Sequence, residues 1–145
     1  MNVAKVYAQV LGIVLLLVGI LGFVPALGGT TGFQPSSSLL GIFPINNLHN
    51  VIHIATGLIG IFAGFYGRGG YARMYALVFG VIYTVVTLLG FIVAPGTDVN
   101  YLVQLVPLNI ADNLLHTGIA LTGLAAYFLT PARVAAEARA SARAA

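Results

Sequence analysis

Two short segments of the sequence contain the side chains that could do chemistry. "PINNLHNVIH" covers residues 44–53 and "PLNIADNLLH" covers residues 107–116. Together they hold the chain's three histidines and one of its three acidic residues: His49, His53, His116 and Asp112. Imidazole and carboxylate groups bind first-row metals, and imidazole titrates near neutral pH. These four residues are therefore the candidates for a polar cluster or a ligand site.

The polar residues of both segments have the spacing of one helix face. Positions i, i+3, i+4 and i+7 share a face of an α-helix. In the first segment they are Asn46, His49, Asn50 and His53, and in the second Asn109, Asp112, Asn113 and His116. Small residues continue the two faces: Gly57, Gly60 and Gly64, and Ala120, Gly123 and Ala126. Small residues let membrane helices approach closely, so we expect the two stripes to pack against each other.

The asparagines have structural explanations. Asn46 and Asn109 each stand two residues after a proline, where a helix is expected to begin, and Asn is a favoured N-cap. Asp112 follows Asn109 at the spacing of a capping box. Asn50 and Asn113 lie one turn further on, where capping cannot explain them. We predict that they hydrogen-bond between the two helices and fix their pairing.

His53 and His116 are open to several interpretations. With a rise of 1.5 Å per residue they lie about 10 Å inside their helices, and an ionisable group inside a membrane span indicates function by default. One interpretation is a structural hydrogen-bonded pair. The others are a first-row metal site completed by His49 and Asp112, axial ligation of a haem, and proton transfer or sensing. We expect no cofactor, with haem or a first-row metal as the alternatives.

The elements that carry these residues are membrane spans. The 145-residue chain is 59% hydrophobic and 6% charged, against about a quarter charged residues in a soluble domain. A spanning helix needs about 20 apolar residues, and four stretches qualify: 5–27, 47–66, 71–94 and 110–130. Residues 1–130 thus form a single membrane domain, and 131–145 form an Ala/Arg tail. The lipid bilayer is the expected environment.

The chain contains an internal repeat. Shifted by 63 positions, residues 44–63 align with 107–126, and Pro44, Asn46, Asn50, His53 and Gly60 all match identical residues. The first and third spans align more weakly. The predicted fold is all-α: a polytopic four-helix bundle of two tandem helical hairpins, related by a pseudo-two-fold axis along the membrane normal. The second and fourth helices are expected at its centre.

The basic residues predict the orientation. All six lie at the N-terminus, in the turn between the second and third spans, or in the tail: Lys5, Arg68, Arg73, Arg133, Arg139 and Arg143. The segments 28–46 and 95–109 contain neither Lys nor Arg. The positive-inside rule then places both termini in the cytoplasm.

Several functions are disfavoured. Charges this sparse do not make a nucleic-acid surface, and the absence of cysteine excludes disulfides and thiolate metal sites. No phosphate-binding loop, nucleophile elbow or HExxH motif is present, so enzymatic chemistry is not expected.

The two motifs resemble a known family. The pattern F-x-x-N-x-x-H-N-x-x-H-x-x-x-G over residues 43–57, followed by N-x-x-D-N-x-x-H over 109–116, is similar to that of domain of unknown function 4383. The resemblance covers residues 5–130. It implies a small four-helix protein of the bacterial inner (cytoplasmic) membrane, and it supplies no reaction, substrate or cofactor.

Three hypotheses about function follow. The first is a non-enzymatic structural or accessory membrane protein, whose Asn/His/Asp cluster holds the central helices together and docks a membrane protein partner or a second copy. The alternative is a metal- or haem-binding protein that uses His53 and His116. A small proton-coupled transporter is the third, and four short unbroken spans argue against it.

Overall fold

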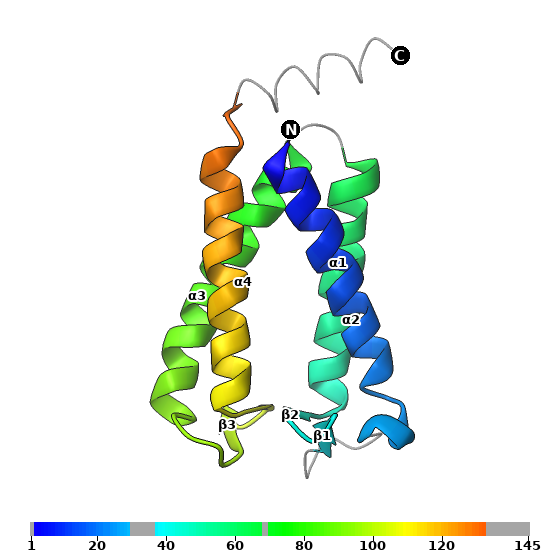
Figure 1. Ribbon diagram of the computed structural model, residues 1–145, viewed down its shortest axis with the longest axis vertical. Coiled ribbons are helices and arrows are strands. Elements are labelled where there is room, and N and C mark those ends of the chain that lie inside the picture. Colours follow the sequence, from blue (N-terminus) through cyan, green and yellow to red (C-terminus); the bar gives the residue numbers. More distant parts are fainter. Residues whose placement is uncertain (1, 30–36, 68–69, 133–145) are drawn as a thin grey trace.

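The computed structural model describes residues 2–29, 37–67 and 70–132, and helices dominate it (Figure 1). The long helices are α1 (Val3–Leu21), α2 (Asn47–Ile61), α3 (Tyr71–Val93) and α4 (Ile110–Leu129). Helix α2 continues directly into a π-helical segment, η2 (Phe62–Tyr66). Three of these helices, α1, α2 with η2, and α3, are long and apolar enough to cross a membrane. Helix α4 is 20 residues long and carries Asp112, Asn113 and His116 near its start.

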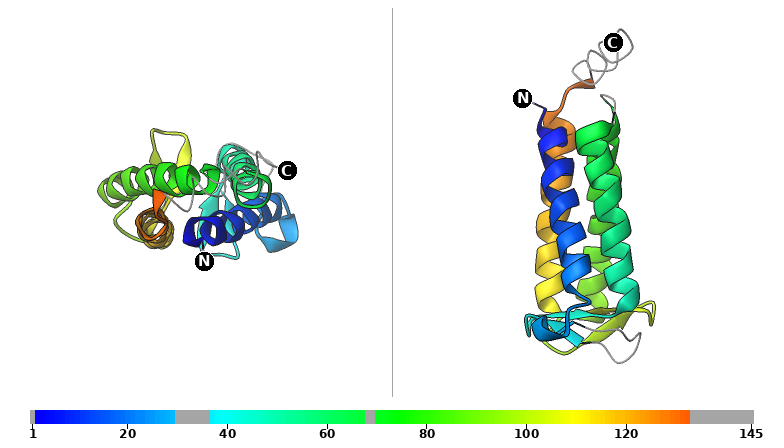
Figure 2. Two further views of the ribbon diagram at one scale, coloured as in Figure 1. Left: turned by 90° about the horizontal axis from the view of Figure 1, so that it is seen from above. Right: turned by 90° about the vertical axis from the view of Figure 1, so that its right-hand side faces the viewer.

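The helices pack as two pairs, α1 along α2 and α3 along α4. Figure 2 shows the pairs from above. In Figure 1 they converge at the end that holds the N-terminus and stand apart at the other end. Each pair is held by glycines: a Cβ on Gly12 of α1 would lie 2.5 Å from the nitrogen of Ile61, and one on Gly80 of α3 would lie 2.9 Å from the nitrogen of Leu124. Such close backbone approach is typical of membrane helices.

The small-residue stripes on α2 and α4 do not pack against each other, which corrects the expectation from the sequence. A Cβ on Gly57 would meet Leu16 of α1, and one on Gly64 would meet Gln9 of α1. Gly60 lies against Gly12 and the Tyr75 hydroxyl, whereas Gly123 lies against Tyr7, Ala76 and Gly80. Each stripe thus packs mainly on the preceding helix of its own pair, because that helix offers a matching glycine, Gly12 or Gly80.

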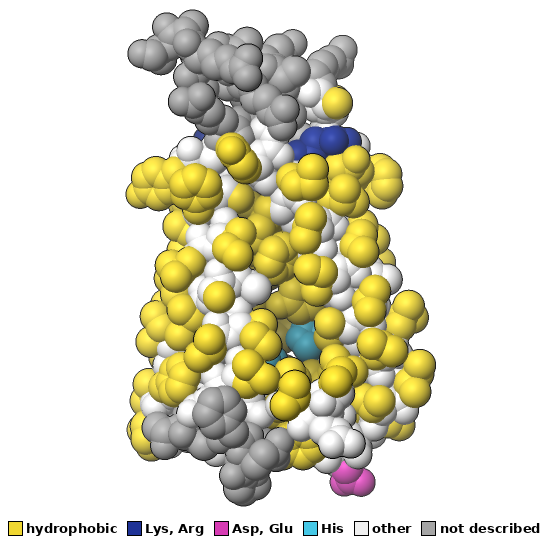
Figure 3. Space-filling view, turned by 180° about the vertical axis from the view of Figure 1, so that it is seen from behind, with side chains coloured by type: hydrophobic (Ala, Val, Ile, Leu, Met, Phe, Trp, Pro, Cys, Tyr) yellow, Lys and Arg dark blue, Asp and Glu magenta, His cyan; other side chains and the backbone are white. Residues whose placement is uncertain are grey.

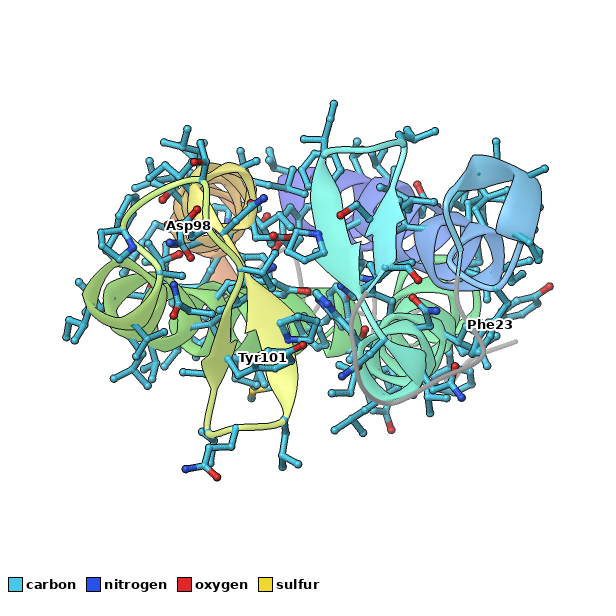
Figure 4. All side chains as sticks on the ribbon, turned by 90° about the horizontal axis from the view of Figure 1, so that it is seen from below. Phe23, Asp98 and Tyr101 are labelled. Atoms are coloured by element: carbon cyan, nitrogen blue, oxygen red, sulfur yellow. The ribbon has the colours of Figure 1, made fainter. Side chains whose placement is uncertain are left out.

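One small β-hairpin connects the two helices of each pair, within the segments 28–46 and 95–109. Strand β1 (Ser37–Leu39) pairs antiparallel with β2 (Phe43–Ile45), and β3 (Asn100–Leu102) pairs antiparallel with β4 (Val106–Leu108). Seen from below, the hairpins lie across the open end of the helix pairs (Figure 4). Each strand has three residues, and β2 and β4 contain proline. Such strands are too short to show alternating hydrophobicity, so the sequence pattern could not predict them.

The first helix ends earlier than predicted. It was expected to reach residue 27, but α1 stops at Leu21 and is followed by a 3₁₀ turn, η1 (Pro25–Leu27). The N–H of Gly22 still bonds the Val18 carbonyl at 2.9 Å, and Pro25 then prevents further helical bonding because it lacks an N–H. The other three predicted spans agree with the observed helices to within one residue at each end, counting η2 with α2.

Apolar side chains cover the outside of the helices. Many Val, Leu, Ile and Phe side chains are exposed on all four helices, and Figure 3 shows apolar side chains spread over the helical part of one face. Such a surface is compatible with lipid contact. Lys5 and Arg73 both lie in first turns at the N-terminal end of the molecule, whereas Arg68, Arg133, Arg139, Arg143 and most of the tail lie outside the described residues.

Candidate functional site

Asn46 and Asn109 cap their helices and also cross between the two helix pairs. The Asn46 Oδ1 accepts the His49 N–H at 2.9 Å, and its Nδ2 donates to the Leu105 carbonyl at 2.8 Å. The Asn109 Oδ1 accepts the Ala111 N–H at 2.9 Å, and its Nδ2 donates to the Ile42 carbonyl at 2.8 Å. Each asparagine thus begins one helix and binds the hairpin that precedes the other.

Asp112 completes the capping of α4. Its Oδ2 accepts the Asn109 N–H at 3.2 Å, while its own N–H donates to the Asn109 Oδ1 at 3.2 Å. These two bonds form a capping box, and a carboxylate in the first turn also suits the helix dipole. Asp112 is buried, and its two hydrogen bonds with Asn109 account for its position at the start of α4.

Asn50 and Asn113 do not join α2 to α4, and that prediction is wrong. The Nδ2 of Asn50 donates to the Gly22 carbonyl at 2.8 Å, and the Nδ2 of Asn113 donates to the Ala94 carbonyl at 2.7 Å. Both acceptors lie at the C-terminal end of the preceding helix, where carbonyls have no partner within the helix. The side chains therefore satisfy helix ends inside each pair. Both asparagines are fully buried.

The three imidazoles come together inside the molecule. The rings of His49 and His53 are 4.4 Å apart between centroids, and His53 and His116 line the same cavities. His116 also packs on Tyr83, with ring centroids 5.1 Å apart. All three histidines are nine-tenths or more buried. Tyr83 was not among the residues singled out from the sequence.

The hydrogen bonds of the histidines are incomplete. The Nδ1 atoms of His49, His53 and His116 are buried and lack a hydrogen-bond partner in the described part of the chain. The ring of His49 bonds the Pro44 carbonyl. No hydrogen bond joins His53 to His116 within residues 2–29, 37–67 and 70–132. The hypothesis of a hydrogen-bonded histidine pair is therefore not supported.

His53 and His116 line three cavities. The largest, about 520 Å³, is a groove between α1 and α4 that opens sideways, and its walls are apolar. A second, about 150 Å³, lies between α2 and α3 and is lined by Phe79 and Tyr83. Figure 3, which views the molecule from the side opposite to Figure 1, shows histidine side chains in a hollow. The third, about 140 Å³, includes Asp112 and residues of the first hairpin. The histidines thus stand where the cavities meet.

Polar contacts join α1 and α3 to α4 and to Thr130, the residue after α4. The Tyr7 hydroxyl donates to the Ile119 carbonyl at 3.2 Å, and the Ala4 N–H donates to the Thr130 Oγ1 at 2.9 Å. The Cζ atom of Arg73 lies 3.8 Å from the centre of the Tyr127 ring, and the Nε of Arg73 donates to the Thr130 carbonyl at 2.8 Å. Sequence reasoning missed Tyr7 and Thr130. Each is a polar side chain near the end of an otherwise apolar helix, and this feature of the sequence could have identified both residues.

The donor set does not fit a multidentate metal site. Among the described residues no group of three or more His, Asp or Glu side chains is arranged to hold a metal ion. A histidine that ligates a metal also donates its other ring N–H to a carbonyl or carboxylate in almost all known sites. The buried Nδ1 atoms of His53 and His116 lack such an acceptor. Metal or haem ligation through Nε2 would thus leave both Nδ1–H groups unpaired.

Comparison with known proteins identifies a family. The family model described as Domain of unknown function (DUF4383) matches residues 5–129, which confirms the resemblance seen in the two motifs. No curated protein and no solved structure matches the chain.

Proposed function

Because the chain belongs to the family Domain of unknown function (DUF4383), which carries no described activity, we propose a role from its geometry. The protein is a non-enzymatic membrane protein that binds an apolar molecule, taken up sideways from the bilayer, in the groove between α1 and α4. The observation that carries the proposal is this groove of about 520 Å³, which holds two buried imidazoles among apolar walls. Clefts with apolar walls and a few placed polar groups are the usual form of small-molecule sites.

The proposed arrangement in the membrane has four spans. Helix α4, at 20 residues, has the length to cross the hydrocarbon layer, and its residues Asp112, Asn113 and His116 are buried. Lys5 and Arg73 lie at one end, which we assign to the cytoplasm of a bacterial inner membrane together with both termini. The hairpins then face the external side.

The proposed pseudo-two-fold axis relates the two helix pairs. The strands of the second hairpin follow those of the first by 63 residues, and Leu40 and Val103, at equivalent positions, both have positive φ values of 55° and 51°. Asn46 donates to Leu105 and Asn109 donates to Ile42, and the two donors and the two acceptors are likewise each 63 residues apart. These correspondences support a duplicated unit whose copies insert the same way round.

The asparagines and the histidines have different roles in this proposal. Asn46, Asn50, Asn109 and Asn113 hold helix ends and join the two pairs, which accounts for them as structural residues. His53 and His116 have no such bonds among the described residues. Both histidines line the groove, so they are the side chains that a ligand in the groove could use for hydrogen bonding.

Bound apolar molecules provide the test. We expect the wild-type protein, purified in a mild detergent, to retain an equimolar apolar molecule that native mass spectrometry and solvent extraction detect. Ala125 is exposed and lines the groove, so Ala125→Phe should fill the groove and abolish retention. Ala55 is exposed and lines none of the three cavities, so Ala55→Phe is the matched control. Equal retention by all three proteins, or none by the wild type, would overturn the proposal.

Haem is the second candidate, favoured by the two histidines that line the same cavity. It has less support because neither Nδ1 has the acceptor that a ligating histidine normally uses. An absorption spectrum of the solubilised protein separates the two candidates. A Soret band lost in both His53→Ala and His116→Ala would establish haem, whereas its absence leaves the apolar ligand.

A further inference from the structure

The geometry points to one class of ligand, an isoprenoid quinone. Its ring would lie at His53 and His116, and its tail would extend along the apolar wall formed by α1 and α4. This inference rests on the proposed function, because it names the apolar molecule that the groove would hold. It is carried by the hydrogen-bonding state of the two imidazoles, by the absence of charge in the groove, and by the groove's length.

The two imidazoles present donors to the groove. Each Nδ1 is buried without a partner among the described residues. Neither Nε2 is fully buried or hydrogen-bonded there, and both histidines line the groove as well as the two smaller cavities. Orphaned N–H donors are rarer in proteins than under-satisfied acceptors. The tautomer that avoids an orphaned donor has its proton on Nε2. Because both histidines line the groove, these two N–H groups are available to a ligand that offers acceptors, as the carbonyl oxygens of a quinone do.

Among the described residues that line the groove, no other side-chain donor is free to bind such a ligand. The Tyr7 hydroxyl donates to the Ile119 carbonyl at 3.2 Å, and the Thr122 hydroxyl donates to the Gly118 carbonyl at 2.7 Å. The remaining lining residues are apolar. The polar part of the ligand must therefore lie at the histidine end, and the rest of the molecule must be hydrocarbon.

The groove has no charged residue to match a phospholipid headgroup. Its described lining contains neither Lys, Arg, Asp nor Glu. Burying a phosphate without a counter-charge is costly, and the histidines lie about 10 Å along their helices from the hairpin end, at 1.5 Å per residue. A neutral ring with acceptor oxygens can be buried at this depth without a counter-charge, whereas a phosphate cannot.

The groove is long enough for a prenyl chain. Its lining runs from Val18 to Val3 along α1 and from Leu115 to Leu129 along α4, which is about 20 Å at a rise of 1.5 Å per residue. It is open sideways toward the lipid-facing surface, so a tail longer than the groove can continue into the bilayer. A short, closed cavity would have favoured a compact ligand instead.

Histidine-selective ¹⁵N NMR provides a direct test, because the chain has only three histidines. The delipidated full chain in nanodiscs is titrated with decylubiquinone and, in parallel, with decylbenzene, which has the same tail and no carbonyl. In the free protein we expect His53 and His116 to carry their protons on Nε2. Decylubiquinone should shift both Nε2 signals and bind about tenfold more tightly than decylbenzene, equivalent to about 1.4 kcal/mol.

Variants show which residues cause a preference for decylubiquinone over decylbenzene. His116→Leu should remove the advantage of decylubiquinone over decylbenzene, and His116→Gln, which retains a donor, should restore part of it. Ala125→Phe should weaken both probes, and Ala55→Phe should weaken neither. An oleate titration tests whether an acidic lipid headgroup competes.

The outcomes separate the two proposals. Equal affinities for both probes, blocked by Ala125→Phe, would overturn the quinone inference and leave the proposed function standing. Tighter binding of oleate than of decylubiquinone would also overturn the inference, in favour of a lipid. If neither probe nor oleate binds, both proposals are wrong. Protons found on Nδ1 in the free protein would also overturn the quinone inference, because each Nε2 would then be an acceptor and could not donate to a carbonyl oxygen.

Discussion

Asn46 and Asn109 each cap one helix while binding the hairpin that precedes the other. The Nδ2 of Asn46 donates to the Leu105 carbonyl, and the Nδ2 of Asn109 donates to the Ile42 carbonyl, both at 2.8 Å. The helix pairs stand apart at this end (Figure 1). The two amides therefore join the halves of the molecule where helix packing does not.

Replacing Asn46 by Ser separates its two roles. A Ser hydroxyl can still accept the His49 N–H as an N-cap, but it is too short to donate to Leu105. We expect Asn46→Ser to lower the free energy of unfolding by about 0.6 kcal/mol, the average for such a bond in a membrane protein. Asn46→Ala should cost about 1 kcal/mol more through loss of the cap. Unfolding in detergent by a chemical denaturant measures both values, and identical losses would contradict the double role.

The contact between Gly90 and Asn113 predicts a steric effect. A Cβ on Gly90 would overlap the Oδ1 of Asn113, whose Nδ2 bonds the Ala94 carbonyl. Gly90→Ala should therefore lower stability by 1–3 kcal/mol, roughly the usual cost of overpacking. Gly118→Ala is the matched control, because a Cβ there meets no atom within 4 Å. Its stability should be unchanged or higher by up to about 1 kcal/mol. Thermal unfolding of both variants gives the comparison.

His116 is expected to be dispensable for stability in the ligand-free protein. Its Nδ1 is buried without a partner among the described residues, and such a group costs about 1–3 kcal/mol. His116→Leu should therefore leave the free energy of unfolding equal or higher. Asn113→Leu, one turn earlier, should lower it, because the Ala94 carbonyl would lose its donor. A large loss of stability in His116→Leu alone would show that the imidazole is structural.

The hairpin turns predict a reciprocal effect of glycine. Gln104 has a φ of 59°, and Gly41, at the equivalent position of the first hairpin, has a φ of 72°. Left-handed backbone costs a non-glycine residue about 1 kcal/mol. Gln104→Gly should therefore raise stability by up to about 1 kcal/mol, and Gly41→Gln should lower it by a similar amount. Equal and opposite shifts in the unfolding midpoint would support the equivalence of the two turns.

The absence of cysteine makes the topology directly measurable. Asp98 and Tyr66 are both exposed and lie at opposite ends of α3. We expect a membrane-impermeant maleimide to label Asp98→Cys in intact spheroplasts, and to label Tyr66→Cys only after the inner membrane is permeabilised. The wild-type chain supplies the unlabelled background. Labelling of Tyr66→Cys from outside would reverse the proposed orientation.

The sequence alone determined the helices and their polar faces. Long apolar runs, the N-x-x-D capping spacing and the 63-residue repeat are local or periodic signals, and they do not depend on how the helices pack. The predicted spans therefore agree with α2, α3 and α4 to within a residue, with η2 counted in α2. The family motif likewise needed only the order of the residues.

Only the tertiary structure decided which faces meet. Small and polar stripes on α2 and α4 are equally compatible with packing on each other or on α1 and α3, because spacing identifies a face and not its partner. The glycines Gly12 and Gly80 decided the pairing, since they let each helix approach its own neighbour. Asn50 and Asn113 then bond helix ends within a pair, and His53 and His116 remain without such bonds beside an apolar groove. Cavities and unpaired atoms arise from how all the elements pack together, and no local pattern in the sequence encodes them.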